Sequence, residues 1–108
     1  MTSTNSDKIT VKVNRPTINS TQANTTITIF KGKNELTPVN VTPTDNQYQV
    51  TITSTKNCTC KLENDYKTIT VLTVTSTAAE INISINVENK KTYTKVISVA
   101  AITDIEVI

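Results

Sequence analysis

Alternation of apolar and polar residues runs through this chain and limits what it can fold into. The clearest example is AEINISINVE, in which isoleucine or valine occupies positions 81, 83, 85 and 87. Asparagine, serine and glutamate occupy the positions between and after them, ending at Glu88. Successive side chains of a β-strand point to opposite faces, so this segment has one face for a core and one for solvent. No long stretch keeps a helical period, and the chain is therefore predicted to be all-β.

Turn residues divide the alternating segments into seven or eight short strands. The strands are expected near residues 9–13, 27–30, 36–41, 48–53, 58–62, 69–74, 81–87 and 93–99. Gly32 and Asn34 in KGKN and Asn89 in ENKK are the residues expected to adopt positive φ in hairpin turns. Short strands with one polar face each, separated by regular turns, predict two antiparallel sheets that pack as a β-sandwich.

One strand is expected to contain an irregularity. Ile69 and Val71 place apolar residues on odd positions, and Leu72 and Val74 then place them on even positions. One extra residue exchanges the two faces of a strand, so this change of phase predicts a β-bulge near residue 71. Leu72 and Val74 are accordingly expected to face the core beyond the bulge.

The size and composition of the chain predict one domain with an aliphatic core. The sequence has 108 residues, of which 36% are hydrophobic and only 4% are aromatic. A chain of this length can build one core but not two, and isoleucine and valine must supply most of it. We expect a polar N-terminal arm at residues 1–7, a sandwich at residues 8–101 and a C-terminal extension at residues 102–108.

The two cysteines, Cys58 and Cys60, lie one residue apart in NCTCKLEN. In a strand they point to the same side as Leu62, with their Cα atoms about 6.6 Å apart, which is the far limit for a disulfide. A metal site would need further ligands, and the chain contains no histidine. Packing as two small apolar side chains in the core is the favoured interpretation. Redox or intermolecular pairing and metal binding are the less favoured alternatives, and no cofactor is predicted.

The composition argues against several functional classes. Histidine, the usual general base, is absent, and the acidic residues are spread singly, so no catalytic site is predicted. The net charge is +2, and the basic residues are scattered with a single arginine, which does not favour nucleic-acid binding. No apolar run approaches the roughly 20 residues that a membrane-spanning helix requires. Tyr66 is the one tyrosine expected to be exposed, and it is the candidate sugar contact.

The second half of the chain resembles the immunoglobulin-like accessory domains of tailed-bacteriophage virion proteins. The resemblance is carried by YQVTITSTKNCTCKLENDYKTITV, by TSTAAEINISINVENKKTYTKVISV and by the KTYTK opening of the last strand. It implies an immunoglobulin-like β-sandwich without enzymatic activity that is located in the virion. The implied role is a structural or decoration protein of the capsid or tail. The implied partners are virion subunits, such as the major capsid or tail protein, with weak adhesion to a host-surface glycan.

Contact with such a partner is predicted at a sheet edge, where unpaired backbone groups can accept another strand. One candidate edge is the proline-containing segment near residues 36–41. The favoured one is the C-terminal segment ITDIEVI, in which apolar residues continue beyond the expected sandwich. The candidate contact residues are Ile102, Ile105, Val107 and Ile108. The alternative function is a carbohydrate-binding or adhesin module of a bacterial surface protein, with Tyr66 as the sugar contact.

Overall fold

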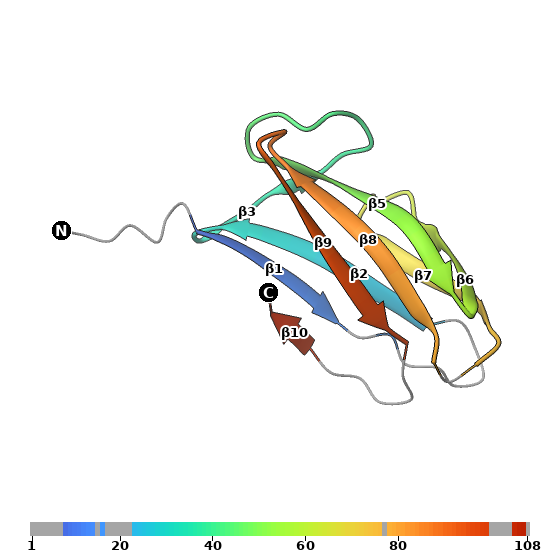
Figure 1. Cartoon of the computed structure of the whole chain (residues 1–108). Coiled ribbons are helices and arrows are strands. Elements are labelled where there is room, and N and C mark those ends of the chain that lie inside the picture. The colour runs from blue at the N-terminus through green and yellow to red at the C-terminus, as the bar shows by residue number, and fades with distance from the viewer. Residues whose placement is uncertain (1–7, 15, 17–22, 77, 100–104, 108) are drawn as a thin grey trace.

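The structure, a computed structural model, describes residues 8–14, 16, 23–76, 78–99 and 105–107. These residues form ten β-strands and no helix (Figure 1). The strands are β1 (Ile9–Asn14), β2 (Ala23–Lys31), β3 (Asn34–Glu35), β4 (Thr37–Pro38), β5 (Gln47–Lys56), β6 (Cys58–Leu62), β7 (Thr68–Val74), β8 (Glu80–Val87), β9 (Lys91–Ser98) and β10 (Ile105–Val107). The all-β prediction is confirmed.

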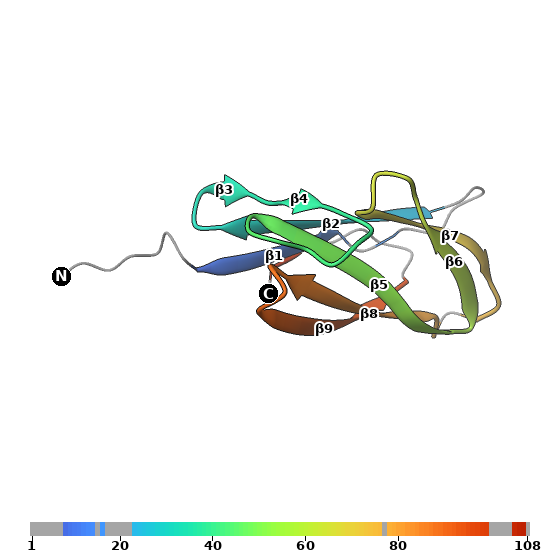
Figure 2. The ribbon, with the colours of Figure 1, turned by 90° about the horizontal axis from the view of Figure 1, so that it is seen from above.

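The strands form two sheets that face one another. The larger sheet has the order β10-β1-β2-β7-β6, with the short β3 paired to β2, and the smaller sheet has the order β4-β5-β8-β9. Figure 2 shows the two layers, with β2 and β7 in one and β8 and β9 in the other. All pairings are antiparallel except that of β4 with β5, which is parallel. The segment expected as one strand near residues 36–41 thus contributes only the two-residue β4.

Isoleucine and valine side chains fill the space between the sheets. In β8, residues 81, 83, 85 and 87 are buried and alternate with half-buried polar residues, as predicted. The largest fully buried side chains are Tyr48, Ile27, Ile29, Leu36, Ile69, Ile81, Ile83, Ile85, Ile97, Val11, Val13 and Val71. Full burial of one such aliphatic side chain stabilises a fold by about 1.5–3 kcal/mol. The β-branched side chains therefore both favour the strands and form the core.

Tyr48 is the one aromatic residue at the centre of this core. It lies on β5 and is fully buried, and its hydroxyl donates a hydrogen bond of 2.6 Å to the carbonyl oxygen of Ile27 on β2. The bond joins the two sheets through side chain and backbone. Burial raises the pKa of Tyr48 above its ordinary value of 10.0, with a smaller contribution from the negative charge of Glu35.

The predicted β-bulge is present in β7. Thr59 pairs with Thr73, and the next residue, Cys60, pairs with Val71, so Leu72 is the extra residue. Leu72 is 41% exposed, and the expectation that it faces the core is wrong because the bulged residue itself leaves the alternation. Val74 packs against the core as predicted. A second register shift, between residues 52 and 54 of β5, had no counterpart in the sequence pattern.

The hairpin turns use residues that tolerate the left-handed region. Gly32 has φ of 62° between β2 and β3, and Asn89 has φ of 56° between β8 and β9, as predicted for both. The same expectation for Asn34 is wrong, because this residue begins β3 and has no positive φ. Asn57, with φ of 59°, is the single residue between β5 and β6 and carries the chain from the smaller sheet to the larger one. The turn chemistry therefore determines where the chain changes direction and where it changes sheet.

Replacing Tyr48 with phenylalanine should lower the free energy of unfolding by about 1 kcal/mol, because the Ile27 carbonyl loses its side-chain donor. Urea denaturation measures this difference. Tyr66→Phe removes the same hydroxyl from a surface turn and is the matched control. An equal effect of both substitutions would contradict the role given to the inter-sheet bond.

The raised pKa of Tyr48 also predicts how stability depends on alkaline pH. Its contribution is present below the ordinary tyrosine value of 10.0, where the phenol is protonated in both states. Above that value the unfolded chain ionises first, so the free energy of unfolding falls as the pH rises toward the higher folded pKa. Urea denaturation at several pH values above 10.0 should show a steeper fall for the wild-type chain than for Tyr48→Phe.

Candidate functional site

The predicted contact segment supplies an edge strand of the larger sheet. Ile105 and Val107 lie in β10, which pairs antiparallel with β1 and places Ile105 opposite Asn14 and Val107 opposite Lys12. Figure 1 shows β10 beside β1, away from the rest of the sheet. Ile102 and Ile108, the other two candidate residues, lie outside the described residues. Part of the segment expected to extend beyond the sandwich is therefore a strand of it, and its role as a partner contact stays a prediction.

The strand that receives β10 is held in place from its other side. β1 pairs with β2 from Ile9 opposite Lys31 to Val13 opposite Ile27. Beyond that ladder, the side chain of Asn14 bonds to β2, and its Oδ1 accepts a hydrogen bond of 2.7 Å from the Thr26 backbone amide. The hydroxyl of Thr25, which is fully buried, donates to the Asn14 carbonyl oxygen. These bonds position the end of β1 without any contribution from β10.

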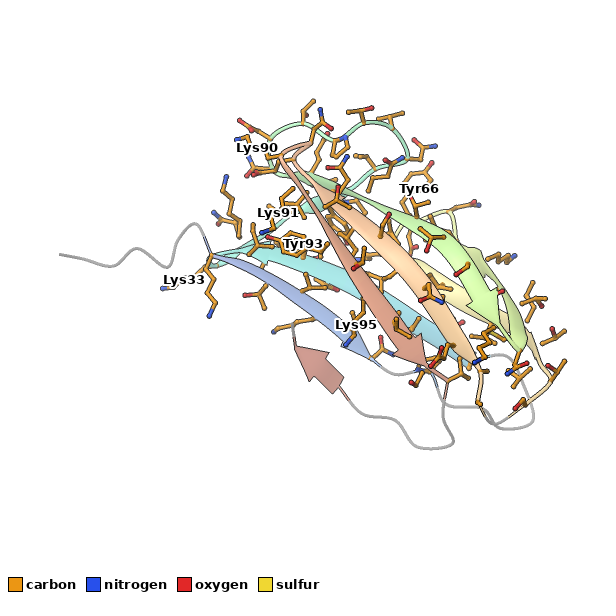
Figure 3. The ribbon with its side chains drawn as sticks, in the orientation of Figure 1. Lys33, Tyr66, Lys90, Lys91, Tyr93 and Lys95 are labelled. Carbon is orange, nitrogen blue, oxygen red and sulfur yellow. The ribbon has the colours of Figure 1, made fainter. Side chains whose placement is uncertain are left out.

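The free edge of the smaller sheet has a different character. Along β9, Lys91, Tyr93 and Lys95 occupy the same alternating positions as the buried Ile97, and Figure 3 shows the three side chains along this strand. Lys95 pairs with the buried Ile83 of β8, and the Lys91 ammonium lies 5.4 Å from the centre of the Tyr93 ring. Lysines at core-facing positions of an edge strand oppose the addition of another strand, because pairing would bury their charge.

Tyr66, the candidate sugar contact, lies in the turn between β6 and β7. It is half-buried, its φ is 62°, and its amide donates a bond of 3.0 Å to the Glu63 carbonyl oxygen. Asp65 closes the same turn by accepting bonds of 2.8 Å from the Thr68 amide and 2.6 Å from the Thr68 hydroxyl. Burial acts to raise the pKa of Asp65, but these bonds and the nearby Lys67 hold it below its ordinary value. The turn is thus well ordered, and sugar contact at Tyr66 stays a prediction.

The cysteine pair packs as the alternation predicts. Cys58 is 8% exposed and belongs to the core, and Cys60 is half-buried and packs against it. Both are free thiols, and the Cys58 Sγ donates to the Glu80 carbonyl oxygen over 3.4 Å. Burial raises the pKa of the Cys60 thiol, and the neighbouring Cys58 adds to the shift. Within the described part of the chain, no three histidine, cysteine, aspartate or glutamate side chains gather as metal ligands would.

A partly buried ion pair at one end of the sandwich was not predicted. Glu88, expected on the exposed face, is 8% exposed, and its Oε2 lies 3.1 Å from the Lys31 Nζ. The same oxygen accepts a bond of 2.9 Å from the Asn46 amide. The expectation failed because β8 ends at Val87 and Glu88 adopts a left-handed φ of 57°, which takes its side chain out of the alternation. The sequence carried no local signal of this, since the partners are far away along the chain.

Glu88 connects three parts of the fold. Lys31 ends β2 in the larger sheet, Asn46 precedes β5, and Glu88 follows β8 in the smaller sheet. The hydrogen bond from the Asn46 amide, followed by the contact with Lys31, lowers the pKa of Glu88 despite its burial. The Glu88 carboxylate therefore accepts hydrogen bonds from a backbone amide and a lysine within the fold.

Comparison with protein-family models, with curated proteins and with solved structures found no significant match to this chain. The residues that the structure describes contain no helix with the length and hydrophobicity needed to cross a membrane.

Alkylation should distinguish the two thiols. Iodoacetamide at neutral pH should modify Cys60 slowly and Cys58 more slowly still, because the thiolate is the reactive form and both groups are shielded. Intact mass measured over time follows the two additions, and the chain unfolded in guanidinium, which should react at once, is the control. Immediate modification of both thiols in the folded chain would contradict the core packing.

Replacing Glu88 with glutamine should lower the free energy of unfolding at neutral pH by about 1–3 kcal/mol, because charge-assisted hydrogen bonds are lost. The lowered pKa means that the stabilisation is present above the ordinary value of 4.5 and is lost as the pH falls through the lower folded pKa. Denaturation curves below pH 4.5 should therefore converge for the two chains. Glu35→Gln, at an exposed ion pair with Lys67, is the control and should have little effect.

Proposed function

We propose that this chain is a non-enzymatic immunoglobulin-like module that serves as a structural or decoration protein of a phage particle. The immunoglobulin-like assignment is supported by the strand order. Seven strands have five or more residues, and lettering them A to G in chain order turns the pairings into A-B-E-D in one sheet and C-F-G in the other. That arrangement is the one found in constant-type immunoglobulin domains.

The position of Tyr48 is consistent with this assignment. Antibody domains bury a tryptophan on strand C against the opposite sheet. Tyr48 lies on β5, the strand that would be C, and reaches β2, the strand that would be B. The chain would thus use a tyrosine and one hydrogen bond where antibody domains use a tryptophan and a disulfide.

A binding role is favoured over a catalytic one by how the charged groups are used. Strongly shifted pKa values often indicate functional sites. Among the described residues, the two carboxylates with lowered pKa values, Asp65 and Glu88, both accept hydrogen bonds from backbone amides in turns. Their shifts have a structural cause, and neither carboxylate is left to act as an acid or base.

The observation that carries the proposed mode of action is the pairing of β10 with β1. In this pairing, the short C-terminal strand β10 is added to the β1 edge of the larger sheet within the same chain. Strand addition gives affinity through backbone hydrogen bonds, and side chains on alternate positions give specificity. In the proposed function, residues 102–108 contact a virion subunit such as the major capsid or tail protein, and many copies on one particle would allow weak adhesion to host-surface glycans.

Deleting residues 102–108 should abolish incorporation into particles while the domain still unfolds cooperatively, because the core strands β5 and β8 remain. Co-sedimentation with particles assembled without this chain measures incorporation, and a thermal melt checks folding. Deleting residues 2–7 is the control and should leave incorporation intact. A folded chain that still enters particles without residues 102–108 would show that the contact lies elsewhere.

A further inference from the structure

We propose that the C-terminal strand is exchanged between copies, so that β10 of one copy pairs with β1 of a second copy in the same antiparallel register. The inference deepens the proposed function by naming a second copy of this chain as a partner of the C-terminal segment. It can be tested on the pure protein, so that its failure and a failure of particle incorporation are separate results.

The acceptor edge is suited to a strand and exists without β10. The core-facing residues of β1 include Val11 and Val13, each 1% exposed, and no charged residue of β1 interrupts this row. In the observed register Val13 is opposite Glu106, while Lys12 and Asn14 on the other face are opposite Val107 and Ile105. β2 and the bonds around Asn14 hold β1 from the other side. β10 pairs only with Lys12, Val13 and Asn14, so no described strand opposes the outer side of Ile9 to Val11.

The other sheet edges are less suited to accepting a strand. On β9, Lys91 and Lys95 occupy core-facing positions. β4 consists of two residues, one of which is Pro38 and lacks an amide donor. One residue, Asn57, separates β5 from β6, so the chain turns from one sheet to the other at that corner. β6 also has an apolar row, formed by Cys58, Cys60 and Leu62. Within the described residues, β1 is therefore distinguished by its pairing with the C-terminal strand.

The donor strand has few ties to its own sandwich. Its described pairings are the three with β1. The last described residue before it, Val99, is buried and bonded through its amide to the Ala79 carbonyl oxygen over 3.0 Å. Val99 follows β9 of the smaller sheet, whereas Ile105 begins β10 of the larger sheet. The pairings of β10 are the same whether β1 belongs to its own copy or to a neighbour.

The local concentration of copies then decides between the two arrangements. When β10 is exchanged between two copies, each contact that it made in its own copy is replaced by the same contact in the other copy. The equilibrium between exchanged and unexchanged chains therefore depends on their effective concentration and not on new interactions. Copies held side by side on a particle are at high local concentration. We take a second copy as the occupant, because the strand that the structure pairs with this edge is the chain's own β10, which every copy carries.

Disulfide trapping between two single variants tests the exchange. Lys12 and Val107 are register partners, and cross-strand pairs in antiparallel sheets have Cα atoms about 4.5–5.5 Å apart, within the range of disulfides. Lys12→Cys chains that carry a mass tag are mixed with untagged Val107→Cys chains at about 1 mM, near the effective concentration of a short linker. Oxidised glutathione is the oxidant, and non-reducing electrophoresis with intact mass identifies the products.

The expected result is a tagged–untagged dimer that forms about tenfold faster, or more, than in a control mixture of Thr94→Cys and Val107→Cys chains. Thr94 is exposed on β9 and is not a register partner of β10. The parent chain, treated in the same way, measures the background from Cys58 and Cys60.

A chain carrying both Lys12→Cys and Val107→Cys, oxidised in dilute solution, tests the pairing within one copy. It should close to an internally linked monomer. If it does so while the mixed single variants link no faster than the Thr94→Cys control, β10 stays on its own β1 and the exchange is wrong. If neither experiment yields the Lys12–Val107 bond, β10 does not use this edge, and the proposal is overturned as well.

Discussion

The burial of β-branched side chains between two sheets is the interaction on which the rest of this structure depends. With aromatic residues at 4% of the sequence, isoleucine and valine must provide the apolar contacts that larger rings supply in many sandwiches. Branched side chains are stiff and lose little freedom in strands, so many small contacts can hold the sheets together. Tyr48 adds a polar element to this core, since its hydroxyl reaches the Ile27 carbonyl across the gap. Burial of these side chains therefore determines which face of each sheet packs against the other sheet.

The end of the sandwich near the β8–β9 turn is held by polar contacts instead. Glu88 accepts from the Asn46 amide and from Lys31, and so joins the two sheets at a point where the aliphatic rows have ended. A carboxylate is tolerated there because every described contact offers it a donor, which offsets the cost of removing it from water. The two sheets are therefore held together by apolar packing in the middle of the sandwich and by charge-assisted hydrogen bonds at this end.

The edges of the sheets connect the fold to the proposed association. Core-facing lysines on β9 and Pro38 on β4 discourage pairing with other chains, as is common for exposed edges. β1 has no such protection in its apolar row and is covered in part by β10. An edge that needs a strand, and a terminal strand that pairs with nothing else described, are complementary features of one chain.

The sequence by itself determined the local features of this protein, and the tertiary structure decided which distant segments meet. Alternation identified β8 and its buried face, the change of phase identified the bulge beside Val71, and Gly32 and Asn89 marked their turns, because each depends only on neighbouring residues. The burial of Glu88 and the parallel pairing of β4 depended on contacts that no local pattern encodes. For the candidate site, the sequence indicated that Ile105 and Val107 suit a strand. Only the fold placed them opposite β1, because residues near positions 13 and 106 are far apart in the sequence and no local pattern specifies which strands pair.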